Sequence, residues 1–153
     1  MTSRELQPAI RFEVGQIVAG RKLEMSLPRV LAFSGGAFDE AGWPQANLHT
    51  NIDKAREAGL DHIIASGTQS EGLLIGLLID IFGNAWHWSG ELEVRFLKPV
   101  RVGDTVQPKL QWLTQAEKAN TTRWIGSVWC ETGAGERVIE GTASCTVPSG
   151  ASQ

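Results

Sequence analysis

The stretch Ser66-Gly-Thr-Gln-Ser-Glu-Gly-Leu-Leu-Ile-Gly-Leu-Leu-Ile-Asp-Ile-Phe-Gly83 decides the fold. Between positions 73 and 82, only Gly76 and Asp80 interrupt a run of large apolar side chains. A helix that is apolar nearly all round lies inside a protein. The run is also shorter than a membrane span, which takes about 20 apolar residues. We therefore predict one buried helix, and no membrane association.

The two ends of this helix carry the residues that helix ends prefer. Ser66 suits the N-cap, Gln69 completes a capping-box pattern, and Gly83 suits the C-terminal end. Gly72 and Gly76 predict a side that a strand or a second helix approaches closely. The start of the helix is a candidate binding site for an anion, because unbonded backbone N–H groups point out of it. An oxyanion that develops during a reaction could be held there.

Composition describes one globular domain, spanning residues 1–153, that can bury a core. Hydrophobic residues make up 42% and charged residues 20% of the sequence. A net charge of -3 without a basic run argues against nucleic acid as a partner. Cys130 and Cys145 lie in strand-like segments and are expected to be buried, reduced thiols.

Three further expectations concern the ends of the chain and metals. The polar segment 1–11 does not have the character of a signal peptide, which indicates a cytoplasmic protein. The small, polar tail 148–153 is expected to be disordered. His49, His62 and His87 show no ligand spacing, so we expect no metal site.

The remaining elements follow from periodicity and turn residues. One or two short strands are expected within 10–25, and the sequence predicts helices at 26–33 and 51–59 with a loop at 34–45. Four alternating segments predict strands at 91–98, 105–114, 121–131 and 137–147. Short connections between them predict an antiparallel meander. The fold class is therefore α+β, with a curved sheet wrapped round the buried helix.

Five short motifs resemble those of one enzyme family. They are Asn47-Leu-His49, Ala58-Gly59, Ile64-Ala-Ser-Gly67, Phe96-Leu-Lys-Pro-Val100 and Gly103-Asp104. Together they resemble the MaoC-like hydratases of the hotdog superfamily. The resemblance implies a hotdog fold and addition of water to a trans-2-enoyl thioester of coenzyme A, or the reverse. It also implies a homodimer in which two sheets join into one, or a higher homo-oligomer of such dimers. The substrate would be an acyl-CoA or acyl-carrier thioester, with no cofactor beyond it.

The resemblance also assigns roles to residues. His49 matches the acid/base histidine of the family, and Gly67 matches the glycine whose N–H binds the thioester oxygen. Ser66, beside Gly67, is a further candidate for this oxyanion hole. The family has an aspartate five residues before the histidine, and Pro44 stands there in this chain. Asp39 or Glu40 could supply the carboxylate instead.

Further candidates complete the expected site. Asn47 could orient the attacking water. Trp43, Thr68 and Lys98 are candidates for substrate contact, Lys98 through the phosphates of coenzyme A.

Two other functions remain open at this point. A thioesterase on the same fold would use Asp39 or Glu71 to activate water against the thioester carbonyl. A non-catalytic subunit would bind acyl-CoA or complete the active site of a partner, and the displaced aspartate is the reason to consider it.

Overall fold

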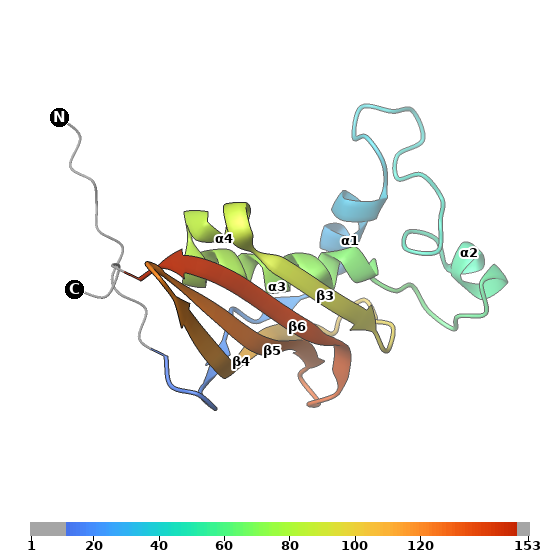
Figure 1. The fold of residues 1–153 in the computed structure, drawn as a ribbon. Coiled ribbons are helices and arrows are strands. Elements are labelled where there is room, and N and C mark those ends of the chain that lie inside the picture. The colour runs from blue at the N-terminus through green and yellow to red at the C-terminus, as the bar shows by residue number, and fades with distance from the viewer. Residues whose placement is uncertain (1–11, 150–153) are drawn as a thin grey trace.

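The computed structural model describes residues 12–149 and has four helices and six strands within them (Figure 1). In chain order they are β1 (Ile17–Ala19), β2 (Leu23–Glu24), α1 (Leu27–Ser34), α2 (Ile52–Glu57), α3 (Gly67–Phe82), α4 (Asn84–Ser89), β3 (Glu91–Phe96), β4 (Thr105–Lys118), β5 (Thr121–Thr132) and β6 (Arg137–Pro148).

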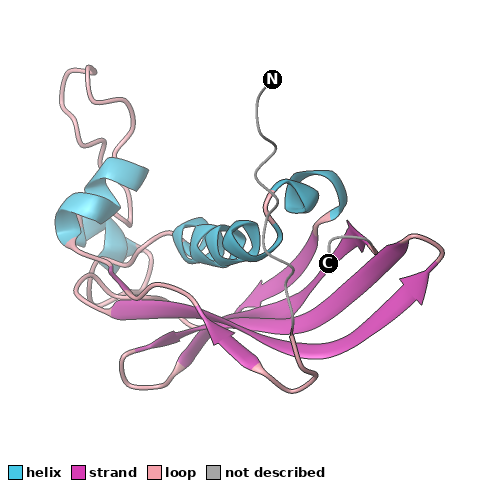
Figure 2. Cartoon of the chain, turned by 90° about the vertical axis from the view of Figure 1, so that its left-hand side faces the viewer, coloured by secondary structure: helices cyan, strands magenta, loops and turns pink. Residues whose placement is uncertain are grey.

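Helix α3 is the buried helix that the apolar run predicts. It lies across one face of the curved sheet (Figure 2). Its Leu74 and Leu78 side chains are fully buried against residues of β4, β5 and β6, among them Leu110 and Val128. Burial of such side chains stabilises the fold by about 1.5–3 kcal/mol each. The predicted α+β class, with a sheet wrapped round one helix, is confirmed.

Two details of α3 differ from the expectation. Ser66 is the N-cap residue, but its side chain makes no capping bond, and its hydroxyl is hydrogen-bonded to that of Thr68 at 2.8 Å. The predicted capping box is therefore wrong. Among residues 12–149, a Cβ atom added at Gly72 or Gly76 would meet no atom of a neighbouring element within 4 Å, so the predicted close approach is absent from this part of the chain.

The order of the sheet is β1-β4-β5-β6-β3, and β2 also pairs with β4. The predicted meander is confirmed for β4, β5 and β6, but it is wrong for β3. This strand pairs antiparallel with β6, for example Val94 with Gly141, at the far edge of the sheet. Residues 97–104 then cross from that edge to β4. Turn residues predict pairing only between strands that follow one another in sequence. The partner of β3 depends instead on how the whole sheet curves round α3.

A short helix and one chain end also depart from the sequence-based expectation. Helix α4 was not predicted; it follows Gly83, whose φ of 55° turns the chain out of α3, and it buries Trp86. Pro148, expected in a disordered tail, still pairs with Thr121 in the sheet. Ser149, also expected in that tail, donates its N–H to the carbonyl of Asn120 at 2.6 Å. Residues 150–153 and the segment 1–11 lie outside the described residues.

Two further expectations can be compared with the fold. Cys130 and Cys145 are free and buried, as predicted. None of the helices between residues 12 and 149 has the length and apolar character needed to cross a membrane.

Candidate functional site

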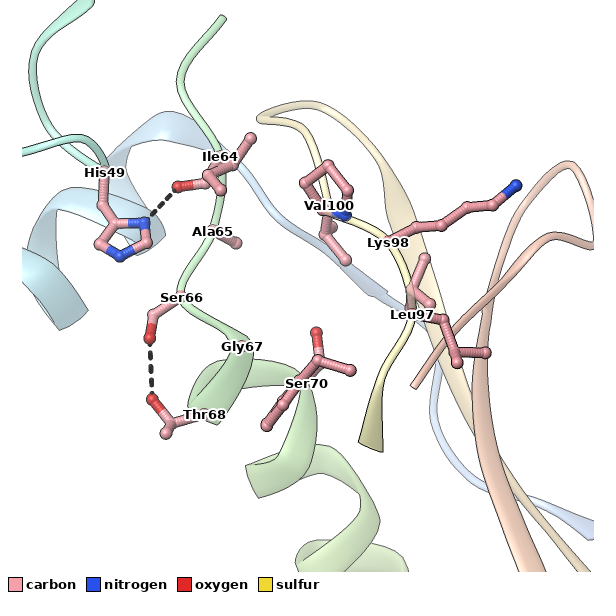
Figure 3. A pocket seen from close by; sticks show the side chains of 13 residues that line it. His49, Ile64, Ala65, Ser66, Gly67, Thr68, Ser70, Leu97, Lys98 and Val100 are labelled. Atoms are coloured by element: carbon pink, nitrogen blue, oxygen red, sulfur yellow. Dashed lines mark hydrogen bonds between the residues drawn. The ribbon is translucent and has the colours of Figure 1, made fainter. Parts of the chain in front are cut away.

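A cavity of about 490 Å³ opens at the N-terminal end of α3 (Figure 3). Its walls come from the loop before α2, the segment leading into α3, the first turn of α3, the segment after β3, and β6. The lining residues are His49, Ile64, Ala65, Ser66, Gly67, Thr68, Ser70, Phe96, Leu97, Lys98, Pro99, Val100 and Val138.

Backbone hydrogen bonds hold the two central walls together. The N–H of Ala65 donates to the carbonyl of Val100 at 2.8 Å, and the N–H of Val102 donates to the carbonyl of Ile63 at 3.2 Å. These bonds tie the segment before α3 to the segment that crosses from β3 to β4. The helix start is therefore fixed beside the residues of the Phe96–Val100 motif. Two motifs that are far apart in sequence thus lie side by side in the cavity wall.

His49 presents one ring nitrogen to the backbone and keeps the other free for chemistry. Its Nδ1 lies 2.8 Å from the carbonyl oxygen of Ile64. A carbonyl oxygen only accepts, so Nδ1 carries the proton and donates it. In the neutral imidazole Nε2 is then an acceptor, and Figure 3 shows it turned away from Ile64. The bond thus selects the tautomer in which Nε2 can act as a base.

Asn47 holds the backbone of His49 in place. Its Oδ1 accepts a hydrogen bond from the N–H of His49 at 2.8 Å, and its Nδ2 donates to the carbonyl of Ser34 at 2.8 Å. Its own N–H donates to the hydroxyl of Thr50 at 2.9 Å. Asn47 is not among the residues that line the cavity. The Asn47 amide therefore joins the two ends of the loop between Ser34 and Asn47, and it also holds the backbone of His49.

The start of α3 leaves backbone donors available. The first N–H groups of a helix have no partner within it, and among the described residues no side chain caps this one. The contrast with α2 is direct, because the side chain of Asn51 accepts hydrogen bonds from the N–H groups of Asp53 and Lys54 there. The donors of Gly67 and Thr68 consequently adjoin the cavity with the positive end of a 16-residue helix behind them.

Gly67 is also a point of close packing. A Cβ atom at this position would lie 2.7 Å from the ring of Phe96. The Phe96 ring therefore rests on the glycine, and the absence of a side chain lets the ring and the helix start share one edge of the cavity.

The structure brings five of the eight residues proposed from sequence into this cavity: His49, Ser66, Gly67, Thr68 and Lys98. The Lys98 ammonium forms an ion pair with the carboxylate of Glu136, at the exposed rim. Asp39, Asn47 and Trp43 do not line the cavity.

A loop closed at its base explains where Asp39 and Trp43 lie. The bond from Asn47 to Ser34 and a second bond, from the N–H of Gln45 to the carbonyl of Gly35 at 2.8 Å, join the two ends of the loop. The loop extends away from the sheet beyond the start of α3 (Figure 1). Asp39 is exposed on it.

The other candidates on this loop have local partners. The Trp43 ring packs against Phe38, with ring centroids 4.9 Å apart. Glu40 accepts a hydrogen bond from the side chain of Gln45. No aspartate or glutamate between residues 12 and 149 lines the cavity, and no group of metal-ligating side chains occurs in that part of the chain.

The cavity also contains residues to which the sequence assigned no role. Ser70 is the polar one, and Val100 and Val138 are part of an apolar inner wall. Ser70 could have been predicted, because residues three apart in a helix, such as Gly67 and Ser70, lie on the same side of it. Val138 could not have been predicted, because its strand is distant in sequence from the other lining residues.

The sequence matches the family described as "MaoC like domain" over residues 46–128, more than half of the chain. A comparison with curated proteins finds no match.

Solved structures support the same fold. A MaoC-like dehydratase from Rhodospirillum rubrum superimposes with a TM-score of 0.71 at 19% identity, over 90% of this chain and 93% of that one. The R-hydratase PhaJ1 from Pseudomonas aeruginosa gives 0.65 at 25% identity, over 92% and 85%. The HadBC (3R-hydroxyacyl-ACP dehydratase) complex from Mycobacterium tuberculosis gives 0.62 at 16% identity, over 88% and 96%.

Proposed function

The chain belongs to the MaoC-like domain family, and from this membership we propose that it is an acyl-thioester hydratase or dehydratase. It would add water to a 2-enoyl thioester of coenzyme A or of a carrier protein, or remove water from the 3-hydroxyacyl thioester. The observation that carries the proposal is the cavity that His49 shares with the uncapped start of α3. It combines one base with backbone donors for an oxyanion.

The reaction assigns each group a step. Water forms a bond to C3 of the enoyl group, and His49 Nε2 takes a proton from it. The electrons of the double bond move toward the thioester, and the N–H of Gly67 stabilises the charge on the thioester oxygen. The imidazolium then returns the proton to C2 and the carbonyl re-forms. One water has been added, and His49 is again neutral.

The position of the substrate follows from the polarity of the walls. The apolar side chains of Leu97, Val100 and Val138 suit an acyl group, whereas Lys98 at the rim suits the phosphates of coenzyme A. Lys98 would exchange its ion pair with Glu136 for the phosphate. No observation supports a thioesterase, since neither Asp39 nor Glu71 lines the cavity.

Replacing His49 tests the proposal. His49→Ala should lower kcat/KM for hydration of crotonyl-CoA by about 10²- to 10⁴-fold, the usual contribution of a general acid/base. Loss of absorbance of the enoyl thioester measures the rate. His87→Ala is the matched control, because His87 is exposed on α4 and does not line the cavity. Equal rates for wild type and His49→Ala over a panel of enoyl-CoAs would refute the proposal.

One observation favours a second candidate, a subunit that works only with a partner. No carboxylate of the described chain lines the cavity, so His49 lacks the acidic neighbour that the family pairs with its histidine. One solved structure of similar fold, HadBC, is described as a complex. Such a subunit would bind acyl-CoA without turnover when purified alone, and activity would appear only with the partner.

The simpler assembly is a homodimer formed through β3. This strand is the edge of the sheet in the described chain, and Phe96 and Leu97 at its end are 53% and 41% exposed. An unpaired edge with exposed apolar side chains is a surface that another strand can cover. Pairing of two β3 strands would join two sheets into one.

A further inference from the structure

Ser70 has a buried hydroxyl group without a hydrogen-bond partner. The residue is only 2% exposed, yet it lines the cavity at the start of α3. Within residues 12–149 no group bonds to its Oγ atom. A buried polar group that lacks a partner is costly, and native proteins rarely retain one without a reason.

The other polar side chains of the cavity all have partners. His49 bonds to the carbonyl of Ile64, Ser66 and Thr68 bond to each other, and Lys98 pairs with Glu136. Ser70 is thus the one polar side chain of the cavity wall, among the described residues, that is left for a ligand.

The backbone position explains where the hydroxyl points. Side chains of a helix lean toward its N-terminus, so Ser70 covers the turn that begins at Gly67. Figure 3 shows the Ser70 oxygen directed into the space between Ala65 and Leu97. His49, Ser66 and Thr68 lie on the other side of that space in the same view.

Neither the usual backbone partner of a helical serine nor the nearby thiol of Cys130 bonds to the Ser70 hydroxyl. A serine in a helix commonly bonds to the carbonyl four residues before it, which is that of Ser66, and Ser70 makes no such bond. Its neighbour Cys130 donates to the backbone carbonyl of Ser70 at 3.5 Å, not to the hydroxyl. Burial raises the pKa of the Cys130 thiol to about 12, so no charge faces Ser70 from that side.

We propose that the Ser70 hydroxyl is a second hydrogen-bond donor to the thioester oxygen, beside the N–H of Gly67. The inference rests on the proposed function, because it takes an acyl thioester as the ligand. The carbonyl oxygen would lie between the helix start and Ser70, with C2 and C3, the carbons that react, toward His49. Two donors then stabilise the charge that collects on this oxygen during addition of water.

Two variants measure the contribution to turnover. Ser70→Ala should lower kcat/KM for crotonyl-CoA by about 10²-fold, the effect of removing one oxyanion donor. Ser70→Thr keeps the hydroxyl and should retain most of the activity. Ser127→Ala, a serine on β5 that does not line this cavity, is the matched control.

A spectroscopic measurement isolates the hydrogen bond from turnover. Butyryl-CoA labelled with ¹³C at C1 binds without reacting, and a donor at its carbonyl lowers the infrared stretching frequency. The frequency should rise toward its value in water when Ser70→Ala replaces the wild type. Thermal unfolding provides a third readout: Ser70→Ala should unfold at the same or a higher temperature, since the variant removes an unpartnered hydroxyl.

The outcomes separate this inference from the proposed function. A carbonyl frequency that does not change in Ser70→Ala overturns the role of Ser70, even where the wild type hydrates crotonyl-CoA. Lower activity with a lower unfolding temperature and an unchanged frequency also overturns it, because that result describes a structural serine. A wild type that binds butyryl-CoA with a Ser70-dependent frequency but hydrates nothing supports the donor role and refutes the hydratase.

Discussion

The side-chain amide of Asn47 connects three parts of the loop that carries His49. It accepts from the N–H of His49, donates to the carbonyl of Ser34, and makes a weaker contact of 3.4 Å to the carbonyl of Gln45. Asn47 itself does not line the cavity, but its Oδ1 is bonded to the backbone of His49, which does. We therefore propose that Asn47 is a positioning residue for His49 in the proposed reaction.

Asn47→Ala should lower both activity and stability. The variant removes the bonds to the Ser34 carbonyl and from the His49 N–H, which are both partly buried, and each is worth about 0.5–1.5 kcal/mol. We expect kcat/KM for crotonyl-CoA to fall at least about 10-fold, because misplaced groups lose proximity. Asn47→Asp keeps the acceptor for the His49 N–H and should lose less activity.

A variant of similar cost to stability is the control for Asn47. Asn51→Ala removes the cap of α2, worth about 1 kcal/mol, and leaves both bonds of Asn47 intact. Chemical denaturation and kinetics on the three variants would compare the effects. If Asn51→Ala reduces activity as much as Asn47→Ala, the positioning role is wrong and general loosening of the loop explains both.

How much of the site the sequence predicts differs from residue to residue. Ser66, Gly67 and Thr68 could be located, because the start of an apolar helix is a local signal. Asp39 and Trp43 could not, because the bonds at the base of their loop join residues ten or more positions apart. Ser70 was overlooked because a serine within a helix is unremarkable until its burial and missing partner are known.

At the scale of elements, α3 has one packed face and one open face. Leu74 and Leu78 are completely buried, whereas Gly72 is exposed with no atom near the position of a Cβ. The pattern of apolar residues predicts the packed face. The open face cannot be predicted from the sequence, because a pair of glycines is compatible both with a close neighbour and with open space.

Gly72→Ala should therefore stabilise the protein. Alanine is favoured over glycine in a helix by about 1 kcal/mol, and here nothing obstructs the added methyl group. Gly83→Ala is the contrasting variant, because its φ of +55° strains any residue with a Cβ, and it should destabilise. Urea denaturation gives both values. Destabilisation by Gly72→Ala would mean that a partner packs on this face of α3 in solution.

At the scale of the whole molecule, the edge position of β3 was beyond the sequence. The pairs β4–β5 and β5–β6 are joined by short turns that predict them, but β3 pairs with a strand more than 40 residues later. The bond from the Leu97 N–H to the Val138 carbonyl at 2.9 Å fixes the alternation of hydrogen bonds along β3. By that alternation, the N–H groups of Leu92, Val94 and Phe96 point away from β6, toward the free edge.

Val94→Pro tests whether this edge forms the homodimer. Proline has no N–H and is tolerated where a strand edge faces outward, so the bonds to β6 should persist while pairing with a second β3 is lost. We expect the wild type to have twice the monomer mass by light scattering, and Val94→Pro to have the monomer mass. Val94→Ala also removes the valine side chain but keeps the backbone N–H, and it should remain a dimer. A dimeric Val94→Pro, or a wild type that is monomeric, would show that β3 is not the subunit contact.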